Sequence, residues 1–219
     1  MQKTIFSCLM LATSFFSCAQ KQKTKNMNQD IPTTKVNLAQ GTAIATFGEG
    51  CFWCTESFFQ RLEGVISVSS GYSGGHVANP SYDAVCTKTT GHAEVLHIVY
   101  DPSKISYDEL LEVFWKTHDP TTPNQQGADV GPQYRSVVFY HNEEQKAKAE
   151  KYKIELDKAG AFNSPIVTLI EPFKNFYPAE EYHQNFYNNN TNYGYCRMVI
   201  RPKLDKFEKV FKDKLKKTN

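Results

Sequence analysis

The sequence carries no large excess of charge of either sign, no low-complexity segment and no internal repeat. Its 25 Lys and Arg residues nearly balance 23 Asp and Glu residues, so the formal net charge is only +2. Proteins that bind nucleic acid through an extended basic surface carry far more positive charge. The composition therefore argues against a nucleic-acid partner and favours a small or peptidic substrate, and we expect a monomer.

The sequence also lacks an apolar run long enough to cross a bilayer near its N-terminus, where residues 5–16 are apolar. Lys3 precedes this run and Ser17-Cys18-Ala19 follows it, which is the order of regions in a secretory signal. The small residue before Cys18 resembles a bacterial lipoprotein signal, in which the cysteine is lipidated. An ordinary cleaved signal or an inner-membrane anchor is the alternative.

We therefore predict three segments: a signal of the lipoprotein type over 1–18, a flexible tether over 19–40, and one folded domain over 41–219. The tether is polar and has little to bury. This organisation predicts a protein on the periplasmic side of the cell envelope, touching the membrane only through its N-terminal lipid anchor. A secreted or soluble periplasmic protein is the alternative.

Cysteine is scarce for a disulfide scaffold. Two of the six cysteines fall in the predicted signal, and four in a domain of this size are too few to form a framework. In an oxidising envelope, a protein that depends on these thiols needs a reducing partner. The four cysteines of the folded domain are Cys51, Cys54, Cys86 and Cys196.

No metal or haem motif accompanies the single Cys-x-x-Cys pair, Cys51 and Cys54. A structural zinc site needs four ligands, and neither a second such pair nor a His pair at finger spacing is present. Haem attachment needs His after the second cysteine, where Thr55 stands. We therefore predict no metal site, and thiol–disulfide exchange stays open.

Alternating and helical apolar patterns predict an α+β fold. Strands are expected over 42–47, 64–72, 92–100, 135–140 and 166–170, and helices over 51–61, 106–117, 142–159 and the C-terminal 203–215, with a helical turn at 81–87. A Ser-x-x-Glu capping box at Ser106 and Glu109 is expected to begin the helix over 106–117. The C-terminal helix is expected to pack one apolar face, with its lysines on a solvated face rather than against a membrane; the apolar residues are Leu204, Phe207, Phe211 and Leu215. This order predicts a two-layer α/β sandwich with a mixed sheet, a ferredoxin-like core and extended loops. Long loops are usually functional or disordered, which directs attention to residues 118–134.

Cys51 is expected at the N-terminus of the helix over 51–61. Unpaired backbone N–H groups and the helix dipole favour a thiolate there, which predicts a lowered pKa and a nucleophile rather than a buried, inert cysteine. Cys86 lies on the helical turn at 81–87 and is interpreted as structural.

Glu94 shares the parity of Leu96, Ile98 and Tyr100 on the strand over 92–100. Burial on an apolar face raises the pKa of a carboxyl group and keeps it able to donate a proton. A Glu near a strand end that reaches solvent is the alternative. Tyr82 and Tyr134 are open to interpretation as core aromatic residues, and Asp129 as a turn residue.

Several long motifs, in order, resemble the peptide methionine sulfoxide reductase A family. They are GCFWCTE, GYSGG, NPSYDAVCTKTTGHAE, HDPTTPNQQGADVGPQYRS and YPAEEYHQNF, and the resemblance covers about 42–209. It implies an enzyme that reduces the S epimer of methionine sulfoxide in proteins, and of the free amino acid, in a domain over 41–219. In the envelope this activity would repair oxidised proteins.

The resemblance also implies roles for individual residues. Cys51 attacks the sulfoxide sulfur, Glu94 protonates its oxygen, and the hydroxyls of Tyr82 and Tyr134 donate hydrogen bonds to that oxygen. The substrate lies against four further residues: the pocket for its methyl group is formed by Phe52 and Trp53, Asp129 helps to hold its main chain, and His183 has a supporting role.

The implied product on the enzyme is a Cys51 sulfenic acid, which a second thiol must condense with to form a disulfide. Cys54, one helical turn away, is the expected first resolving residue, and Cys196 is an alternative resolver or a relay. The resemblance implies electrons from a thioredoxin-like dithiol and no bound cofactor. The competing hypotheses are a general thiol–disulfide oxidoreductase and a non-catalytic binding module with an aromatic pocket.

Overall fold

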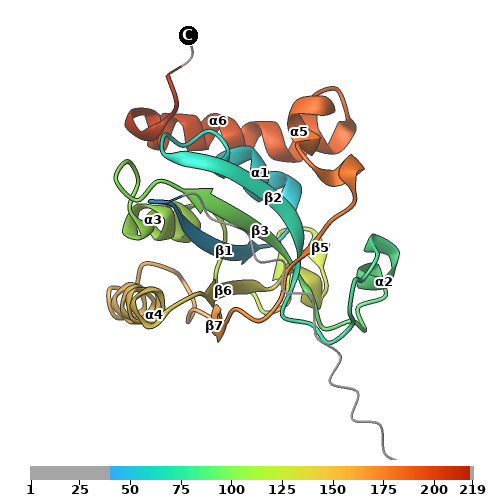
Figure 1. Cartoon of the computed structure of the whole chain (residues 1–219), viewed down its shortest axis with the longest axis horizontal. Helices are drawn as coiled ribbons and strands as arrows, with labels where there is room; N and C mark the ends of the chain where they lie inside the picture. The colour runs from blue at the N-terminus through green and yellow to red at the C-terminus, as the bar shows by residue number, and fades with distance from the viewer. Residues whose placement is uncertain (1–39, 218–219) are drawn as a thin grey trace, which may run out of the picture. The chain divides into compact units, whose positions relative to one another are not determined.

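The computed structural model describes residues 40–217, whose centre is a six-stranded mixed sheet (Figure 1). The strand order is β7-β6-β1-β3-β2-β8, and only β6 and β7 pair in parallel. The strands are β1 Ala43–Glu49, β2 Val65–Ser73, β3 Ala93–Tyr100, β6 Ser136–Tyr140, β7 Leu169–Pro172 and β8 Tyr177–Pro178.

The four central strands have ferredoxin-like connectivity. Helix α1 (Phe52–Phe59) joins β1 to β2, and helix α3 (Tyr107–Thr117) joins β3 to β6. In each unit the two joined strands are separated by a third strand that runs antiparallel to both. The α+β class, the mixed sheet and the ferredoxin-like core predicted from the sequence are confirmed.

The two faces of the sheet bury different clusters. On one face Phe47, Leu96 and Ile98 pack in a core with the apolar residues of α1 and α3. On the other, a smaller cluster centred on Val95 and Phe139 is covered by the loop after β7. Since side chains of a strand alternate between faces, the parity of Leu96 and Ile98 places Glu94 on the helix-covered face.

The predicted helix starts have the expected capping residues. The Ser106 hydroxyl accepts the Glu109 N–H at 3.2 Å, and a Glu109 carboxylate oxygen accepts the Ser106 N–H at 2.9 Å, which forms the predicted capping box. Helix α4 (Glu143–Lys158) begins after Asn142, whose side chain accepts the Gln145 N–H. It lies beside β6 and β7, toward that edge of the sheet (Figure 1).

The C-terminal helix packs one apolar face on α1 and leaves its lysines in solvent. A π-helical turn (Cys196–Ile200) leads into α6 (Arg201–Val210), followed by a short 3-10 turn (Lys212–Lys214). Leu204, Phe207 and Phe211 are buried, whereas Leu215 is half-buried and forms a bridge with Leu62. The prediction of a solvated lysine face on a packed helix is confirmed.

The structure departs from the sequence-based expectation in two segments. The loop over 118–134 contains a short hairpin, β4 (Gln125–Gln126) and β5 (Asp129–Val130), and a 3-10 turn (Pro132–Tyr134). The strand predicted at 166–170 begins only at Leu169. Before it, the Ile166 N–H donates to the Asp157 carboxylate and the Val167 N–H to the Pro120 carbonyl, so these groups do not join the sheet.

The predicted signal, with Cys18, and all of the predicted tether except its last residue lie outside the described residues. Within residues 40–217, no helix is long and apolar enough to cross a membrane. The same part of the chain contains no group of three or more His, Cys, Asp and Glu side chains arranged to hold a metal ion.

Candidate active site

The site is built around the first turn of α1, which begins directly after a glycine turn. Cys51 is the N-cap residue, and its carbonyl accepts the Cys54 N–H at 3.1 Å. Gly50 has a φ of +95°, and a Cβ there would lie 2.5 Å from Cβ of Gln126. A side chain at residue 50 would therefore strain the backbone and displace the loop over 118–134. The glycine lets that loop close against the two thiols.

Glu94 is buried beneath the start of α1. Its Oε2 accepts the backbone N–H of Phe52 at 3.0 Å, and only 2% of the residue is exposed. Burial raises the pKa of Glu94 to about 8, although the Phe52 N–H acts in the opposite direction. At neutral pH the carboxyl group therefore holds a proton, as its strand parity predicts.

Two tyrosine hydroxyls lie close enough to this carboxyl group and to Cys51 to interact with them electrostatically. Tyr82 starts helix α2 (Tyr82–Cys86), and Tyr134 ends the 3-10 turn after β5. Burial is the main cause that raises the pKa of both tyrosines. The nearby negative charge of an ionised Glu94 would raise it further. Both hydroxyls therefore stay protonated and can donate hydrogen bonds, as the sequence interpretation requires.

The two thiols of α1 interact directly. The Cys51 thiol donates a hydrogen bond to Cys54, which raises the pKa of Cys51, and burial adds to this effect. The same hydrogen bond lowers the pKa of Cys54, and the Lys203 ammonium acts in the same direction. The sequence-based prediction of a lowered pKa for Cys51 is therefore wrong for this structure, because the partner thiol and burial outweigh the helix terminus.

Tyr195 is a site residue that the sequence analysis missed. Its hydroxyl donates to Asp129 Oδ2 at 2.9 Å and lies 3.8 Å from the Cys54 sulfur. Asp129 therefore accepts a hydrogen bond from Tyr195, in addition to its predicted role of holding the substrate main chain. The NYGYC stretch holds this tyrosine directly before Cys196, but only the fold brings it back to α1.

Aromatic rings form the wall beside the thiols. The Trp53 ring stacks on Phe186 with a centroid distance of 3.7 Å, and its Nε1–H donates to His183 Nδ1 at 3.1 Å. Phe52 is buried between Tyr72 and His183. His183 lies in a 3-10 turn (Glu181–His183), and Phe186 begins α5 (Phe186–Asn189). His183 thus orients Trp53, which is consistent with the supporting role expected for it.

Glu180 fixes the position of Tyr82 and was also missed. One carboxylate oxygen accepts the Tyr82 N–H at 2.8 Å, and the other accepts the Tyr72 hydroxyl at 3.2 Å. Tyr72 is the cross-strand neighbour of Glu94. Glu180 lies in the quoted YPAEEYHQNF motif, but its hydrogen-bond partners are about a hundred residues away in the chain. A local sequence pattern does not predict such contacts.

The remaining two cysteines occupy opposite environments. Cys196 is completely buried in the main core, where burial and the Cys54 charge raise its pKa. Its predicted role as an alternative resolver or relay stays a prediction. Cys86 is exposed rather than packed in the interior, and its sulfur accepts a hydrogen bond from the Tyr82 hydroxyl.

Apart from Cys196, the fold thus gathers the predicted site residues of the described chain from five separate segments. The start of α1 supplies the thiols and two aromatic residues, and Glu94 lies beneath it. Three further segments complete the arrangement with Tyr82, with Asp129 and Tyr134, and with His183. In Figure 1, α2 and the segment of β5 lie at the same end of the sheet. A nucleophilic thiol, a protonated carboxyl group and hydroxyl donors together can reduce a polar S–O bond.

Residues 43–215 match the family model described as peptide methionine sulfoxide reductase. The chain is 54% identical over 188 residues to the peptide methionine sulfoxide reductase MsrA 1 of Rhodopirellula baltica, covering 85% of this chain and 96% of that protein. It is 56% identical over 173 residues to MsrA of Saccharolobus solfataricus, covering 79% and 97%.

Solved structures give the same result. The chain is similar to reduced Mxr1 of Saccharomyces cerevisiae, with a TM-score of 0.68 and 35% identity over 76% of this chain and 96% of that one. It is also similar to methionine sulfoxide reductase A of Corynebacterium diphtheriae. There the TM-score is 0.65 and the identity 34%, over 73% of this chain and 80% of the other.

Proposed function

The chain belongs to the peptide methionine sulfoxide reductase A family, and from this premise we propose how its residues carry out the reaction. The substrate is the S epimer of methionine sulfoxide, in proteins and as the free amino acid. The observation that supports this most strongly is the buried Glu94, held by the Phe52 N–H at 3.0 Å directly below Cys51.

In the first step, the Cys51 sulfur attacks the sulfoxide sulfur while Glu94 protonates the sulfoxide oxygen. The attack joins the two sulfurs in a transient bond. The protonated oxygen then passes to the Cys51 sulfur as the S–O bond of the substrate and the sulfur–sulfur bond break, so methionine leaves and Cys51 carries a sulfenic acid. The proton of the Cys51 thiol replaces the one that Glu94 gave. Tyr82 and Tyr134 donate to the same oxygen, where negative charge would otherwise develop.

The high pKa of the resting Cys51 thiol fits this sequence of events. A thiol that keeps its proton until substrate arrives is protected from idle oxidation, since the thiolate is the reactive form. Proton transfer to the sulfoxide through Glu94 then couples ionisation of Cys51 to the presence of substrate. The half-buried Trp53 and the buried Phe52 supply apolar surface for the methyl group beside the sulfur.

In the second step, the Cys54 thiol attacks the Cys51 sulfenic acid, and the hydroxyl leaves as water. One disulfide results, and Cys54 is the first resolving residue because it already contacts Cys51. A thioredoxin-like dithiol protein then reduces the disulfide, so the cycle needs no bound cofactor. Cys196 lies in the buried core and serves at most as a later acceptor.

We further propose that the protein acts as a monomer in the cell envelope, where it repairs oxidised proteins. The support for this location is the order of regions over residues 1–18. Lipidation of Cys18 would anchor the domain, and the polar segment after it would let the domain reach substrates near the membrane.

A single-turnover assay without reductant tests the reaction. Epimer-resolved sulfoxide peptide is mixed with wild type, Cys51→Ser and Cys54→Ser, and methionine is counted per enzyme. We expect about one methionine, from the S epimer only, in wild type and Cys54→Ser, and none in Cys51→Ser. Methionine from neither epimer would refute the proposal and favour a disulfide oxidoreductase.

A further inference from the structure

A second carboxyl group is buried on the Cys54 side of the thiol pair, and the reaction as described does not use it. Glu49 ends β1, two residues before Cys51, and only 5% of it is exposed. Its Oε2 accepts the Thr117 hydroxyl at 2.8 Å, whereas its Oε1 is buried without a hydrogen-bond partner. A buried polar atom without a hydrogen bond is costly, and a catalytic role is one explanation for such an atom.

The surroundings of Glu49 connect it to Cys54. The groups that act on it electrostatically are the Cys54 thiol from α1 and the Lys203 ammonium from α6, besides the hydroxyl of Thr117 from α3. His118, which follows α3, has its pKa lowered to about 4 by burial and is neutral. Burial raises the pKa of Glu49 well above that of an exposed carboxyl group, so its ionised form takes up a proton more readily than an exposed carboxylate does.

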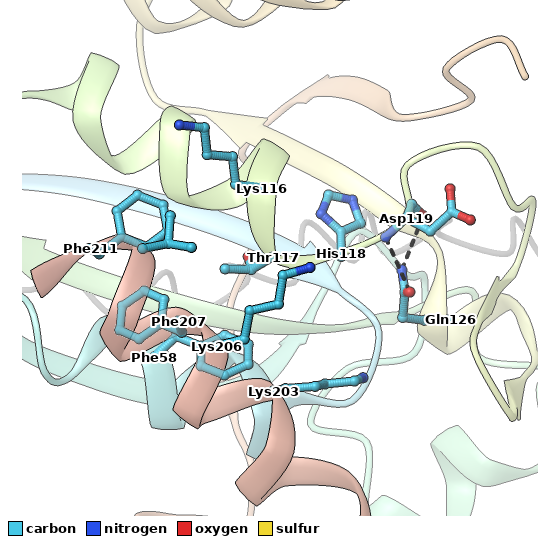
Figure 2. A pocket seen from close by; sticks show the side chains of 11 residues that line it. Phe58, Lys116, Thr117, His118, Asp119, Gln126, Lys203, Lys206, Phe207 and Phe211 are labelled. Carbon is cyan, nitrogen blue, oxygen red and sulfur yellow. Dashed lines mark hydrogen bonds between the residues drawn. The ribbon is translucent and has the colours of Figure 1, made fainter. Parts of the chain in front are cut away.

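Thr117, whose hydroxyl donates to Glu49, also lines a basic hollow of about 350 Å³. Thr117, Gln126 and Lys203 line this hollow, and Figure 2 shows three lysines around its phenylalanine floor. Hydrogen bonds between Gln126 and the backbone of Asp119 close one end. Protons taken up by Glu49 therefore have a short route to solvent past Thr117.

The second step of the proposed reaction creates a need for a proton acceptor at Cys54. In the resting state, the main cause that lowers the pKa of Cys54 is the hydrogen bond from the Cys51 thiol. That thiol proton is gone once Cys51 carries the hydroxyl group, while burial continues to favour the neutral Cys54 thiol. Only a thiolate attacks efficiently.

We propose that Glu49 accepts the proton of Cys54 as Cys54 closes the disulfide with Cys51. The S–H bond of Cys54 breaks, the S–S bond forms, and the S–O bond of Cys51 breaks. The leaving hydroxyl takes a proton from Glu94. Glu49 then releases its proton to solvent and Glu94 takes one up, so the sum is one disulfide and one water. This inference rests on the proposed function.

The test separates the two steps in one rapid-quench experiment with sulfoxide peptide and no reductant. Methionine reports the first step, which consumes the Cys51 thiol; loss of a second free thiol reports the second step, and dimedone traps the sulfenic acid. In Glu49→Gln we expect disulfide formation to slow at least about tenfold relative to methionine formation, with sulfenic acid accumulating. Its rate should also lose the dependence on pH that Glu49 imposes.

Three further variants decide between proton transfer and a merely structural role. Glu49→Asp keeps a carboxyl group and should retain the pH dependence at a reduced rate. Thr117→Val removes a hydrogen bond that lowers the pKa of Glu49, so the pH profile of disulfide formation should shift to higher pH. Glu63→Gln, the same change at an exposed residue, should alter neither step.

A disulfide that closes at the wild-type rate in Glu49→Gln would overturn the inference. So would an equal slowing in Thr117→Val with no shift of its pH profile, since Glu49 would then only anchor α3. Absence of methionine in the wild type would instead refute the proposed function, and this inference with it. Thermal unfolding of each variant shows that the fold is kept.

Discussion

At the residue scale, the protonation of Glu94 is expected to set the pH range of the proposed first step. Burial raises its pKa to about 8, so the acid form, which is the proposed proton donor, predominates below this pH. We expect the rate of methionine formation to be fully present below about pH 8 and to fall above it as Glu94 ionises. Single-turnover rates across this range measure the effect directly.

Glu94→Gln supplies the matched variant for this prediction. The amide keeps the shape of the side chain and can still accept the Phe52 N–H, but it has no proton to give. General acid catalysis contributes roughly a hundredfold or more, and we expect a loss of this order together with loss of the fall above about pH 8. A variant that kept an unchanged pH profile would show that another group titrates.

The properties of single residues were also the hardest to predict from the sequence. The parity of Glu94 on its strand was sufficient to place it on the helix-covered face, because alternation is a local property. The direction of the Cys51 pKa was predicted wrongly, because it depends on the hydrogen bond to Cys54, which spacing alone does not reveal. Tyr195 could not be located beside Cys54 without knowing how the chain folds back across a separation of 141 positions.

At the scale of elements, α1 is tied to the segment that precedes α5 by a buried carboxylate. Glu56 Oε1 accepts the Asn185 N–H at 2.8 Å, and its Oε2 accepts the Phe186 N–H at 3.2 Å. Asn185 has a φ of 52°, in the left-handed region, so this turn needs such support. The arrangement holds Phe186 against Trp53, at the predicted substrate pocket.

Glu56→Gln is expected to weaken both the fold and the pocket. An amide offers one acceptor where two backbone N–H groups need one each, which costs about 1–3 kcal/mol of unfolding free energy. Because the Phe186–Trp53 stack loosens, we expect KM for a sulfoxide peptide to rise severalfold while kcat changes less. Urea unfolding and steady-state kinetics measure the two effects.

Glu150→Gln, on the exposed face of α4, is the control for that change and should alter neither quantity. If Glu56→Gln lowered stability but left KM unchanged, Glu56 would be a purely structural residue. The link from α1 through Phe186 to the substrate pocket would then be refuted.

The elements themselves were largely predictable, and the exceptions have a common cause. The capping box at Ser106 and the apolar stripe of Leu204, Phe207 and Phe211 are local signals, and both were confirmed. The strand predicted from residue 166 starts later because Ile166 and Val167 bond to Asp157 and to Pro120. Hydrogen bonds to residues outside the strand therefore determine where β7 begins.

At the scale of the whole molecule, the two carboxyl groups flank the thiol pair from different elements. Glu94 comes from β3 and is the proposed acid of the first step, whereas Glu49 ends β1 and is the proposed base of the second. Their strands are neighbours in the sheet, so a short helix laid across both strand ends receives a carboxyl group for each thiol. The fold thereby separates the proton chemistry of the two proposed steps.

The predicted lipid anchor concerns the molecule as a whole and is tested independently of the active site. In a bacterial host, the full chain should incorporate labelled fatty acid and partition into detergent, because Cys18 is the predicted lipidated residue. Cys18→Ala should lose both properties. Cys8→Ala, in the apolar run of the same predicted signal, is the matched cysteine control and should keep them.

Reductase activity on a soluble sulfoxide peptide should be the same in all three proteins, because the family match spans only residues 43–215. Activity on oxidised membrane-associated proteins should fall in Cys18→Ala alone, since release from the membrane lowers the local concentration of enzyme. A wild-type chain without fatty acid, cleaved after the apolar run, would contradict lipidation and favour a soluble periplasmic or secreted enzyme.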